Sequence, residues 1–251
     1  SQRYHLRVDQ PTDILERVQE VPWEPTQRER FLWRMLIDDS TLGFQEKMAK
    51  VALAELDPQL ASGDPTMRCS LQKRLMDLIE TLLEGSIDDR GARDTVLVTE
   101  TYLSQWLLQH PRYLDDNNLP KILYEKLSDF LKKLEGLRED KSGKLINCHV
   151  IHGSTDLIER RNAIANMRSS RENRDSQTVV FAFDTCIGSG INLSWTDAVI
   201  ELESARTQMQ REQVLGRVDR ENNDQADYYI LRSENSLLGT FQDHEIGRAH
   251  V

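Results

Sequence analysis

The stretch Gln210–Arg220, which reads QREQVLGRVDR, decides how the rest of the chain is interpreted. In it, Gln213, Gly216, Arg217 and Arg220 follow the spacing Q-x-x-G-R-x-x-R. On a helix, the glutamine and the two arginines are related as i, i+4 and i+7, so their side chains leave one face. The glycine permits close approach of a backbone or a ligand. The guanidinium groups on such a face match phosphate oxygens in geometry and charge, which indicates a phosphate-binding helix. The alternative interpretation is an amphipathic helix whose arginines are solvated.

A glycine-containing loop lies a short distance upstream, within Asp184–Glu203, DTCIGSGINLSWTDAVIELE. Gly188 and Gly190 allow a backbone path that brings this loop close to a phosphate, and Asn192 can cap or bridge. The alternative interpretation is an ordinary tight turn between a strand and a loop.

These two stretches together resemble motifs V and VI of the superfamily-two helicases, most closely the Swi/Snf type of chromatin-remodelling ATPase. The resemblance implies that Arg217 and Arg220, with Gln213, act as arginine fingers on the γ-phosphate of ATP bound by a neighbouring lobe. It also implies nucleotide contacts along the two motifs, at Gly188, Gly190, Asn192 and Gly216. ATP and Mg²⁺ are then expected to be held mainly by a first lobe.

The turn HGST, which ends at Thr155, follows a predicted strand and begins a predicted helix. A helix N-terminus favours an anion, and the alternative is an ordinary N-cap by Ser154 or Thr155. Remodelling ATPases have a similar turn along the DNA strand that they track. The resemblance therefore implies nucleic-acid contacts at Ser154, Thr155, Arg160 and Thr185.

From residue 94 the chain alternates β-branched apolar runs with helical patterns, which predicts a parallel α/β sheet of the RecA-like type. Strands are expected at 94–100, 146–154, 178–183, 197–203 and 226–233. Helices are expected between them at 101–109, 121–137, 155–170 and over the arginine-bearing stretch, with a polar loop at 171–177.

The first 93 residues are expected to form a connector, up to about residue 24, and then a helical region. A capping box of Thr26 and Glu29 predicts a helix over 27–38, with Phe31 and Met35 on its apolar side together with Leu32 and Leu36. Two more helices are expected at 41–56 and 70–83, the last capped by a serine and ended by Gly85. A similar helical region precedes the second lobe in the remodelling ATPases.

The bulk composition is that of a globular intracellular protein. The 251 residues are 38% hydrophobic and 29% charged, with a net charge of −10, so any nucleic-acid contact must be a local patch. No apolar run approaches a membrane span, and no signal peptide begins the chain. Three scattered cysteines indicate a reducing compartment, and the family resemblance implies the nucleus. His149 and His152 fall on opposite faces of a strand, so no metal site is predicted.

The last residues, 245–251, read EIGRAHV, and their reverse translation matches the start of a common sequencing adapter. We therefore expect a truncated transcript whose natural protein continues further. The expected domains are the connector and helical region at 1–93, the RecA-like lobe at 94–235, and a tail at 236–251 of which 245–251 is an artefact.

Departures from the family pattern surround the intact arginines. Thr185, Cys186 and Ile187 replace the usual arginine, alanine and glycine, and the sequences ARTQ at 205–208 and ENN after Arg220 are also atypical. Neither a P-loop nor a D-E-x-H box occurs, so this chain alone is predicted to be inactive as an ATPase.

The predicted function is the second motor lobe of a DNA-dependent ATPase acting on chromatin or in repair, partnered by duplex DNA, possible nucleosomes and a first lobe. The alternatives are the lobe of an RNA helicase, and a degenerate lobe that serves as a non-catalytic interaction module.

Overall fold

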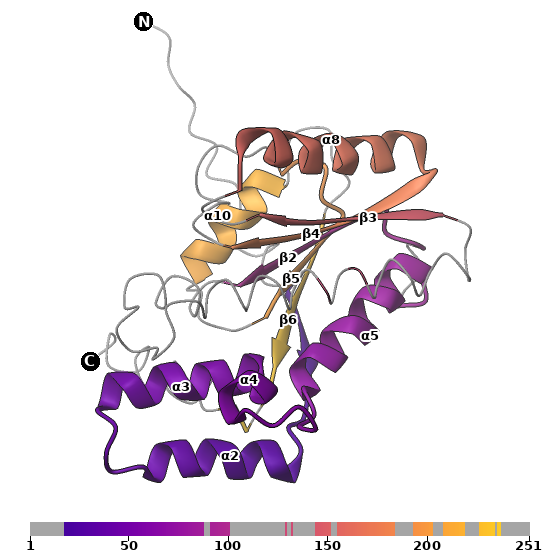
Figure 1. Cartoon of the computed structure of the whole chain (residues 1–251). Helices are drawn as coiled ribbons and strands as arrows, with labels where there is room; N and C mark the ends of the chain where they lie inside the picture. Colours follow the sequence, from indigo (N-terminus) through magenta and orange to yellow (C-terminus); the bar gives the residue numbers. More distant parts are fainter. Residues whose placement is uncertain are drawn as a thin grey trace, which may run out of the picture.

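The computed structural model describes residues 18–87, 91–100, 129, 132, 144–151, 155–183, 193–202, 208–218, 226–233, 235 and 236. Their framework is a six-stranded, wholly parallel sheet (Figure 1). In chain order its strands are β1 (Val18–Pro22), β2 (Thr95–Glu100), β3 (Leu145–Ile151), β4 (Ser176–Phe183), β5 (Ala198–Glu201) and β6 (Asp227–Arg232). In space they follow the order β1-β6-β5-β2-β4-β3, which confirms the predicted α/β class.

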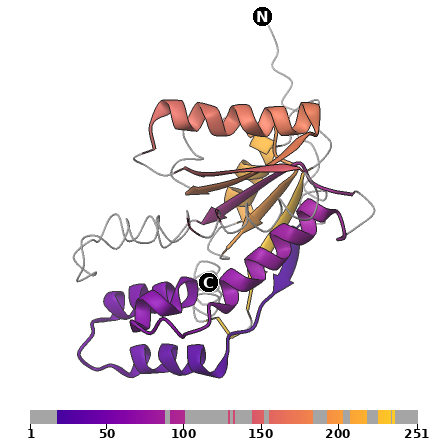
Figure 2. The ribbon, with the colours of Figure 1, turned by 45° about the vertical axis from the view of Figure 1, so that its right-hand side comes forward.

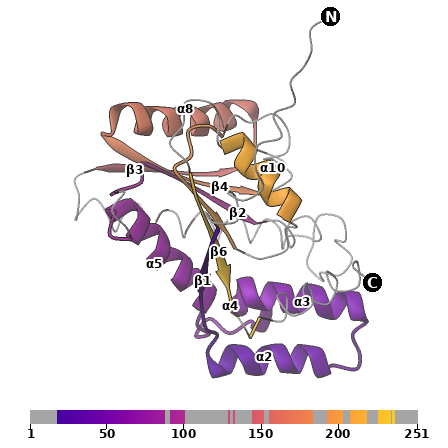
Figure 3. The ribbon, with the colours of Figure 1, turned by 180° about the vertical axis from the view of Figure 1, so that it is seen from behind.

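The central strands are buried on both sides because apolar residues occupy both faces of each strand. Along β2, Val96 and Val98 contribute to the core on one face, and Leu97 contributes to the core on the other. The first core packs against α5 (Ser70–Glu84), and the second packs against α8 (Leu157–Asn173) and α10 (Gln208–Val218). Figures 1 and 3 show α8 and α10 on the opposite side of the sheet from α5. The sheet is therefore a middle layer with a helical layer on each face.

The prediction of a plain connector up to residue 24 is wrong for β1, which joins the edge of the sheet. Val18 pairs in register with Tyr228, and Val21 is buried against the lobe. Gln19 and Glu20 between them are exposed, and Glu20 forms an ion pair with Arg232 on β6 at 2.7 Å. The strand has five residues, and its two valines are three positions apart and not two, so the sequence shows no strand alternation that would separate it from a connector.

The predicted helical region is present as α2 (Gln27–Asp38), α3 (Phe44–Leu56), α4 (Pro58–Ser62) and α5. The capping box at Thr26 is confirmed, and Gly85 ends α5 in a left-handed conformation with φ of 77°. Figure 2 shows α2, α3 and α4 together below the sheet, with α5 leading from them to the sheet. The short helix α4 was not expected from the sequence.

Three local expectations differ from the structure. On α2, Trp33 is buried whereas Phe31 and Met35 are exposed, because the capping-box face turns toward the core. The N-cap of α5 is Cys69 and not the expected serine. The loop expected at 171–177 is largely absent, because α8 continues to Asn173 and β4 begins at Ser176. The helices expected at 101–109 and 121–137 lie outside the described residues, positions 129 and 132 excepted.

Glu29 joins the beginnings of two helices. Its carboxylate accepts hydrogen bonds from the Thr26 backbone N–H at 2.6 Å, from the Ser70 backbone N–H at 2.8 Å and from the Ser70 hydroxyl at 2.6 Å. The side chain is 1% exposed. One buried acceptor thus satisfies N-terminal donors of both α2 and α5, which lie far apart in the sequence.

Replacing Glu29 with alanine is expected to lower the free energy of unfolding by about 2 kcal/mol, because buried N–H donors lose their acceptor. Urea unfolding followed by circular dichroism measures this change. The control is Glu46→Ala, which removes only the partly exposed ion pair with Lys50 at 3.5 Å and is expected to cost under about 0.5 kcal/mol. Equal losses in the two variants contradict the special role of Glu29.

Candidate nucleotide and nucleic-acid site

The sequence-predicted site residues follow the carboxyl ends of β3, β4 and β5, the edge at which open α/β sheets bind ligands. In Figures 1 and 3 the arrowheads of β2 and β4 point to the side of the molecule where α10 lies. The structure describes five of the predicted residues, namely Thr155, Arg160, Gln213, Gly216 and Arg217. Six others lie outside the described residues, namely Ser154, Thr185, Gly188, Gly190, Asn192 and Arg220.

Helix α10 separates an apolar face from a polar one, as its sequence predicted. Val214, Leu215 and Val218 are at most 6% exposed and belong to the core beneath the sheet face that α8 also covers. Gln213 is exposed, and Arg217 is half-buried on the other side of the helix axis. The core contacts therefore fix the rotation of α10 and turn Gln213 and Arg217 away from the sheet.

Gly216 is an exposed residue in the last turn of this helix. A Cβ atom placed on it meets no heavy atom within 4 Å, and its backbone does not adopt a positive φ. Among the described residues, therefore, neither packing nor backbone geometry requires glycine here. A glycine inside a helix costs about 1 kcal/mol relative to alanine, and the described surroundings offer no gain that offsets this cost.

The beginning of α8 is organised around Asp156, which is its N-cap. The Asp156 carboxylate accepts a hydrogen bond from the Glu159 N–H at 2.8 Å, so neither Ser154 nor Thr155 caps the helix. Thr155 is 7% exposed, and its hydroxyl donates to the Val150 carbonyl at 3.4 Å. The helix begins at Leu157, two residues after the start expected at residue 155.

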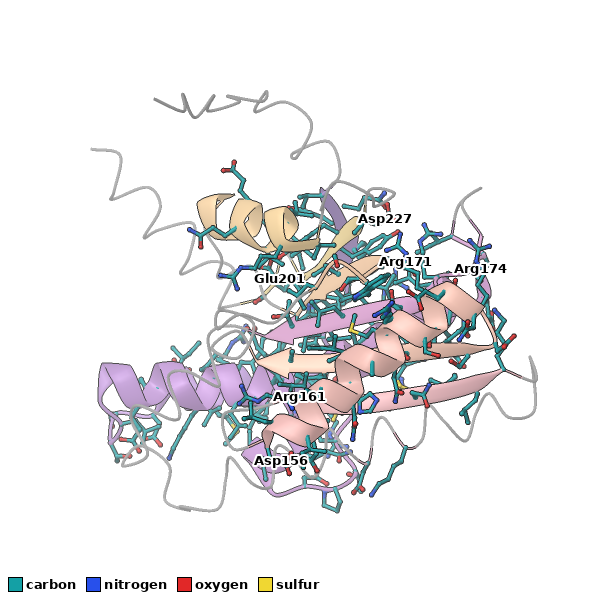
Figure 4. All side chains as sticks on the ribbon, turned by 90° about the horizontal axis from the view of Figure 1, so that it is seen from above. Asp156, Arg161, Arg171, Arg174, Glu201 and Asp227 are labelled. Atoms are coloured by element: carbon teal, nitrogen blue, oxygen red, sulfur yellow. The ribbon has the colours of Figure 1, made fainter. Side chains whose placement is uncertain are left out.

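Arg160 and Arg161 have different surroundings although they are adjacent. The Arg160 Nε donates to the Thr155 carbonyl at 2.9 Å, so this side chain folds back onto the turn that precedes α8. Arg161 is exposed, and Figure 4 shows it near Asp156 at the same end of the helix. Neighbours on a helix point about 100° apart, so only one arginine of the pair can contact the turn. The arginine doublet was visible in the sequence, but Arg161 was not singled out there.

Glu201 is a buried carboxylate at the carboxyl end of β5 that sequence reasoning missed. It is fully buried, and the Tyr228 hydroxyl on β6 donates to its Oε2 at 2.6 Å. Glu203, two residues further along the chain, lies outside the described residues. The alternation of Ile200, Glu201, Leu202 and Glu203 predicts that both glutamates lie on a polar face, so the sequence contained no signal for the burial of Glu201.

A network of ion pairs and hydrogen bonds lies at the amino edge of the sheet, opposite the carboxyl edge that the predicted site residues follow. The Arg93 guanidinium binds the Asp227 carboxylate at 2.7 and 3.0 Å, and both residues are buried. The Asp197 carboxylate accepts from the Asp94 and Thr95 N–H groups at 3.1 Å each. Burial raises the pKa of the Asp94 carboxyl, although Lys144 lowers it. Figure 4 shows Arg171, Arg174 and Asp227 at this edge, away from Asp156 and Arg161, so the network supports the fold and not the predicted site.

His149 lies on β3 in a structural setting. Burial lowers the pKa of its imidazole, and its Nε2 lies 2.9 Å from the Asn166 side-chain nitrogen. Among the described residues, no group of three or more His, Cys, Asp or Glu side chains is placed to hold a metal ion. No helix in the described part of the chain is long and apolar enough to cross a membrane.

These features define a RecA-like lobe whose motifs follow the carboxyl ends of its strands. Residues 117–222 match the helicase conserved C-terminal domain, and no curated protein matches the chain. The matched range contains both motif stretches that the sequence singled out, Asp184–Glu203 and Gln210–Arg220, in agreement with the predicted resemblance. The fold of the chain resembles that of the SWI2/SNF2 ATPase core domain of Sulfolobus solfataricus, with a TM-score of 0.56 at 16% identity over 92% of this chain and 42% of that one.

Two further solved structures were matched at lower TM-scores. The C-terminal part of the Fun30 ATPase domain gives 0.45 at 15% identity, over 86% of this chain and 64% of that one. The ATP-dependent Type ISP restriction-modification enzyme LlaBIII, bound to DNA, gives 0.41 at 14% identity, over 73% of this chain and 11% of that one. The chain spans less than two thirds of the length of each of these three structures.

Proposed function

We propose that this lobe is the second motor lobe of an ATP-dependent, DNA-stimulated translocase of the chromatin-remodelling or DNA-repair type, acting in the nucleus. The observation that supports it best is the orientation of α10. Its apolar residues fix the helix on the core, and Gln213 and Arg217 lie on its other side beside the space left at Gly216. A rigidly held guanidinium is suited to phosphate charge that develops during hydrolysis.

The described residues fit one half of an ATP site. Their contribution is cationic, at Arg217, whereas no acidic cluster suited to Mg²⁺ is found among them. When bound, ATP and Mg²⁺ supply the phosphoanhydride to be broken and its charge neutralisation. We assign their binding mainly to a first lobe of the natural protein. Arg217 and Arg220 orient and stabilise the γ-phosphate, and Gln213, Gly188, Gly190 and Asn192 shape the approach to it.

The Gly216→Ala substitution is expected to raise the stability of the lobe and to lower ATP hydrolysis. Alanine has the higher helix propensity, so the free energy of unfolding of this chain should rise by about 0.5–1 kcal/mol. Hydrolysis by the full natural protein should fall, because the added methyl occupies the space in which the first lobe approaches α10. Chemical unfolding and steady-state ATPase assays measure the two effects. A stabilised variant with unchanged hydrolysis contradicts the close approach at this position.

For nucleic acid, we propose that Arg160 positions the turn containing Ser154 and Thr155, and that the exposed Arg161 contacts a backbone phosphate. We assign Thr185 to the same surface for the nucleic-acid backbone. The Arg160 bond to the Thr155 carbonyl supports the positioning role, because this bond holds the turn against the start of α8. The exposure of Arg161 at the same helix end supports the contact role.

The Arg161→Ala substitution is expected to weaken duplex binding about threefold to tenfold and to reduce the salt dependence of binding by about one phosphate contact. Fluorescence anisotropy of labelled DNA at several salt concentrations measures both. The control is Arg168→Ala on the same helix, which pairs with Glu172 at 2.8 Å and stacks over Trp195. If both variants lose affinity equally, the effect is one of net charge alone.

The proposed function is tested by assaying the full natural protein for ATP hydrolysis with duplex DNA, with RNA and with neither. Stimulation by duplex DNA is expected, and this chain alone should show no hydrolysis. Greater stimulation by RNA favours the RNA-helicase alternative. If the natural protein has no first lobe or no turnover, the lobe is a non-catalytic interaction module.

A further inference from the structure

The side of α2 that faces away from the core exposes large apolar side chains beside arginines. This α2 outer face consists of Arg30, Phe31, Arg34, Met35 and Ile37. Phe31 is 64% exposed, Met35 is 56% exposed and Ile37 is 37% exposed. Figures 1, 2 and 3 all place α2 at the outer margin of the molecule, with α3 and α4 between it and the sheet.

The fold of this chain does not use the α2 outer face. Glu29 and Trp33 are the buried residues of the helix, and both belong to its opposite side. Leu32 and Leu36 pack partly against the same core. Phe31 lies on the solvent side together with Arg34, one turn further along. An exposed phenylalanine and methionine on one helix face are typical of a binding surface, because isolated solvent-facing positions are more often polar.

The charge of this face differs from that of the chain. The net charge is −10, yet Arg30 and Arg34 lie along one side of Phe31 and Met35 and form no ion pair with the described residues. Arg28, on the same helix, does pair with Asp64 at 2.7 Å. The positive charge of Arg30 and Arg34 beside exposed apolar side chains attracts acidic groups and repels basic ones.

We infer that the α2 outer face binds an acidic amphipathic helix of a partner protein. In such a segment, apolar side chains cover Phe31 and Met35, and flanking Glu or Asp side chains meet Arg30 and Arg34. Phenylalanine, methionine and arginine are the residues enriched at protein interfaces. Nucleic acid fits less well, because phosphate leaves the exposed apolar side chains uncovered. This site is independent of the arginines on α10.

The test uses this chain and a fluorescein-labelled synthetic helix of about 18 residues, with leucines on one face and glutamates on both flanks. A second peptide has lysine in place of every glutamate, and a third probe is a labelled DNA duplex. Fluorescence anisotropy should show that the acidic peptide binds and that the other two probes bind at least about tenfold more weakly.

Substitutions then locate the site. The Phe31→Ala variant should lose about 30-fold or more in affinity for the acidic peptide, as expected for an aromatic anchor. Arg34→Glu should also weaken binding and abolish its salt dependence. The control is Leu145→Ala, which removes a leucine of similar exposure (59%) at the start of β3 and should leave affinity unchanged. Thermal unfolding followed by circular dichroism establishes that all variants are folded.

Four outcomes overturn the inference. They are the absence of acidic-peptide binding, binding that survives Phe31→Ala, tighter binding of the duplex through the same residues, and self-association of the chain that Phe31→Ala abolishes. The last two would assign the face to nucleic acid or to a second copy of the chain. None of them bears on the motor function, since ATP hydrolysis is not part of the test.

Discussion

Replacing Arg217 with alanine is expected to lower DNA-stimulated ATP hydrolysis by the full natural protein about 10³-fold, the contribution typical of an arginine finger. Binding of ATP in the ground state should change far less, since the guanidinium acts on charge that develops in the transition state. The substitution lies on the side of α10 opposite Val214, Leu215 and Val218, so the helix should keep its core contacts. Single-turnover hydrolysis and nucleotide-binding titrations measure the two quantities.

Two companion variants sharpen this test. Arg217→Lys keeps the charge and removes the planar fork, so most of the activity should still be lost. Arg168→Ala removes an exposed arginine from α8 and should leave hydrolysis unchanged even where duplex binding is slightly weaker. Hydrolysis by Arg217→Ala at the rate of the unsubstituted protein would exclude the arginine-finger role.

Replacing Arg93 with alanine is expected to destabilise this lobe by about 3–5 kcal/mol, because it leaves the buried Asp227 carboxylate without its cation. The Arg93 side chain is 6% exposed and that of Asp227 is 11% exposed, and the bonds between them tie the segment before β2 to the beginning of β6. Chemical unfolding measured by tryptophan fluorescence gives the free-energy difference. Such a loss approaches the whole stability of many domains, so the variant is expected to fold only at low temperature.

A double substitution distinguishes loss of a pair from loss of packing. Arg93→Met combined with Asp227→Leu removes both charges and retains most of the volume, so it should recover much of the lost stability. The exposed pair of Arg168 and Glu172 provides the comparison, since breaking it with Glu172→Ala should cost under about 1 kcal/mol. If Arg93→Ala costs no more than Glu172→Ala, the buried pair has little influence on the fold.

Local patterns in the sequence predicted much of this architecture. The β-branched runs at 95–100 and 178–183 indicated buried strands, and the spacing within α10 indicated which residues leave its polar face. The capping box at Thr26 located the beginning of α2 to the residue. Each of these signals depends on residues that lie within one or two turns of one another, so the sequence contains them directly.

Features that depend on distant partners were not predictable in the same way. The Arg93–Asp227 bond joins residues 134 positions apart, and Glu29 meets Ser70 across 41 positions. Phe31 was assigned to the core because it is apolar, but the rotation of α2 is set by the burial of Glu29 and Trp33. For the candidate site, the sequence singled out Arg160 through the family resemblance, and only the structure showed that its surroundings differ from those of Arg161.

The pairing of β1 with β6 has a consequence for how the protein is made. Glu20 and Arg232, which bond across this edge, are 212 residues apart, so the first strand leaves the ribosome long before its partner exists. At synthesis rates of about 5–20 residues per second, β1 waits on the order of ten seconds or more with its backbone groups unpaired. Completion of the sheet is therefore a late event, and a nascent chain that stops before β6 leaves two strand edges, at β1 and β5, open to chaperones or to aggregation.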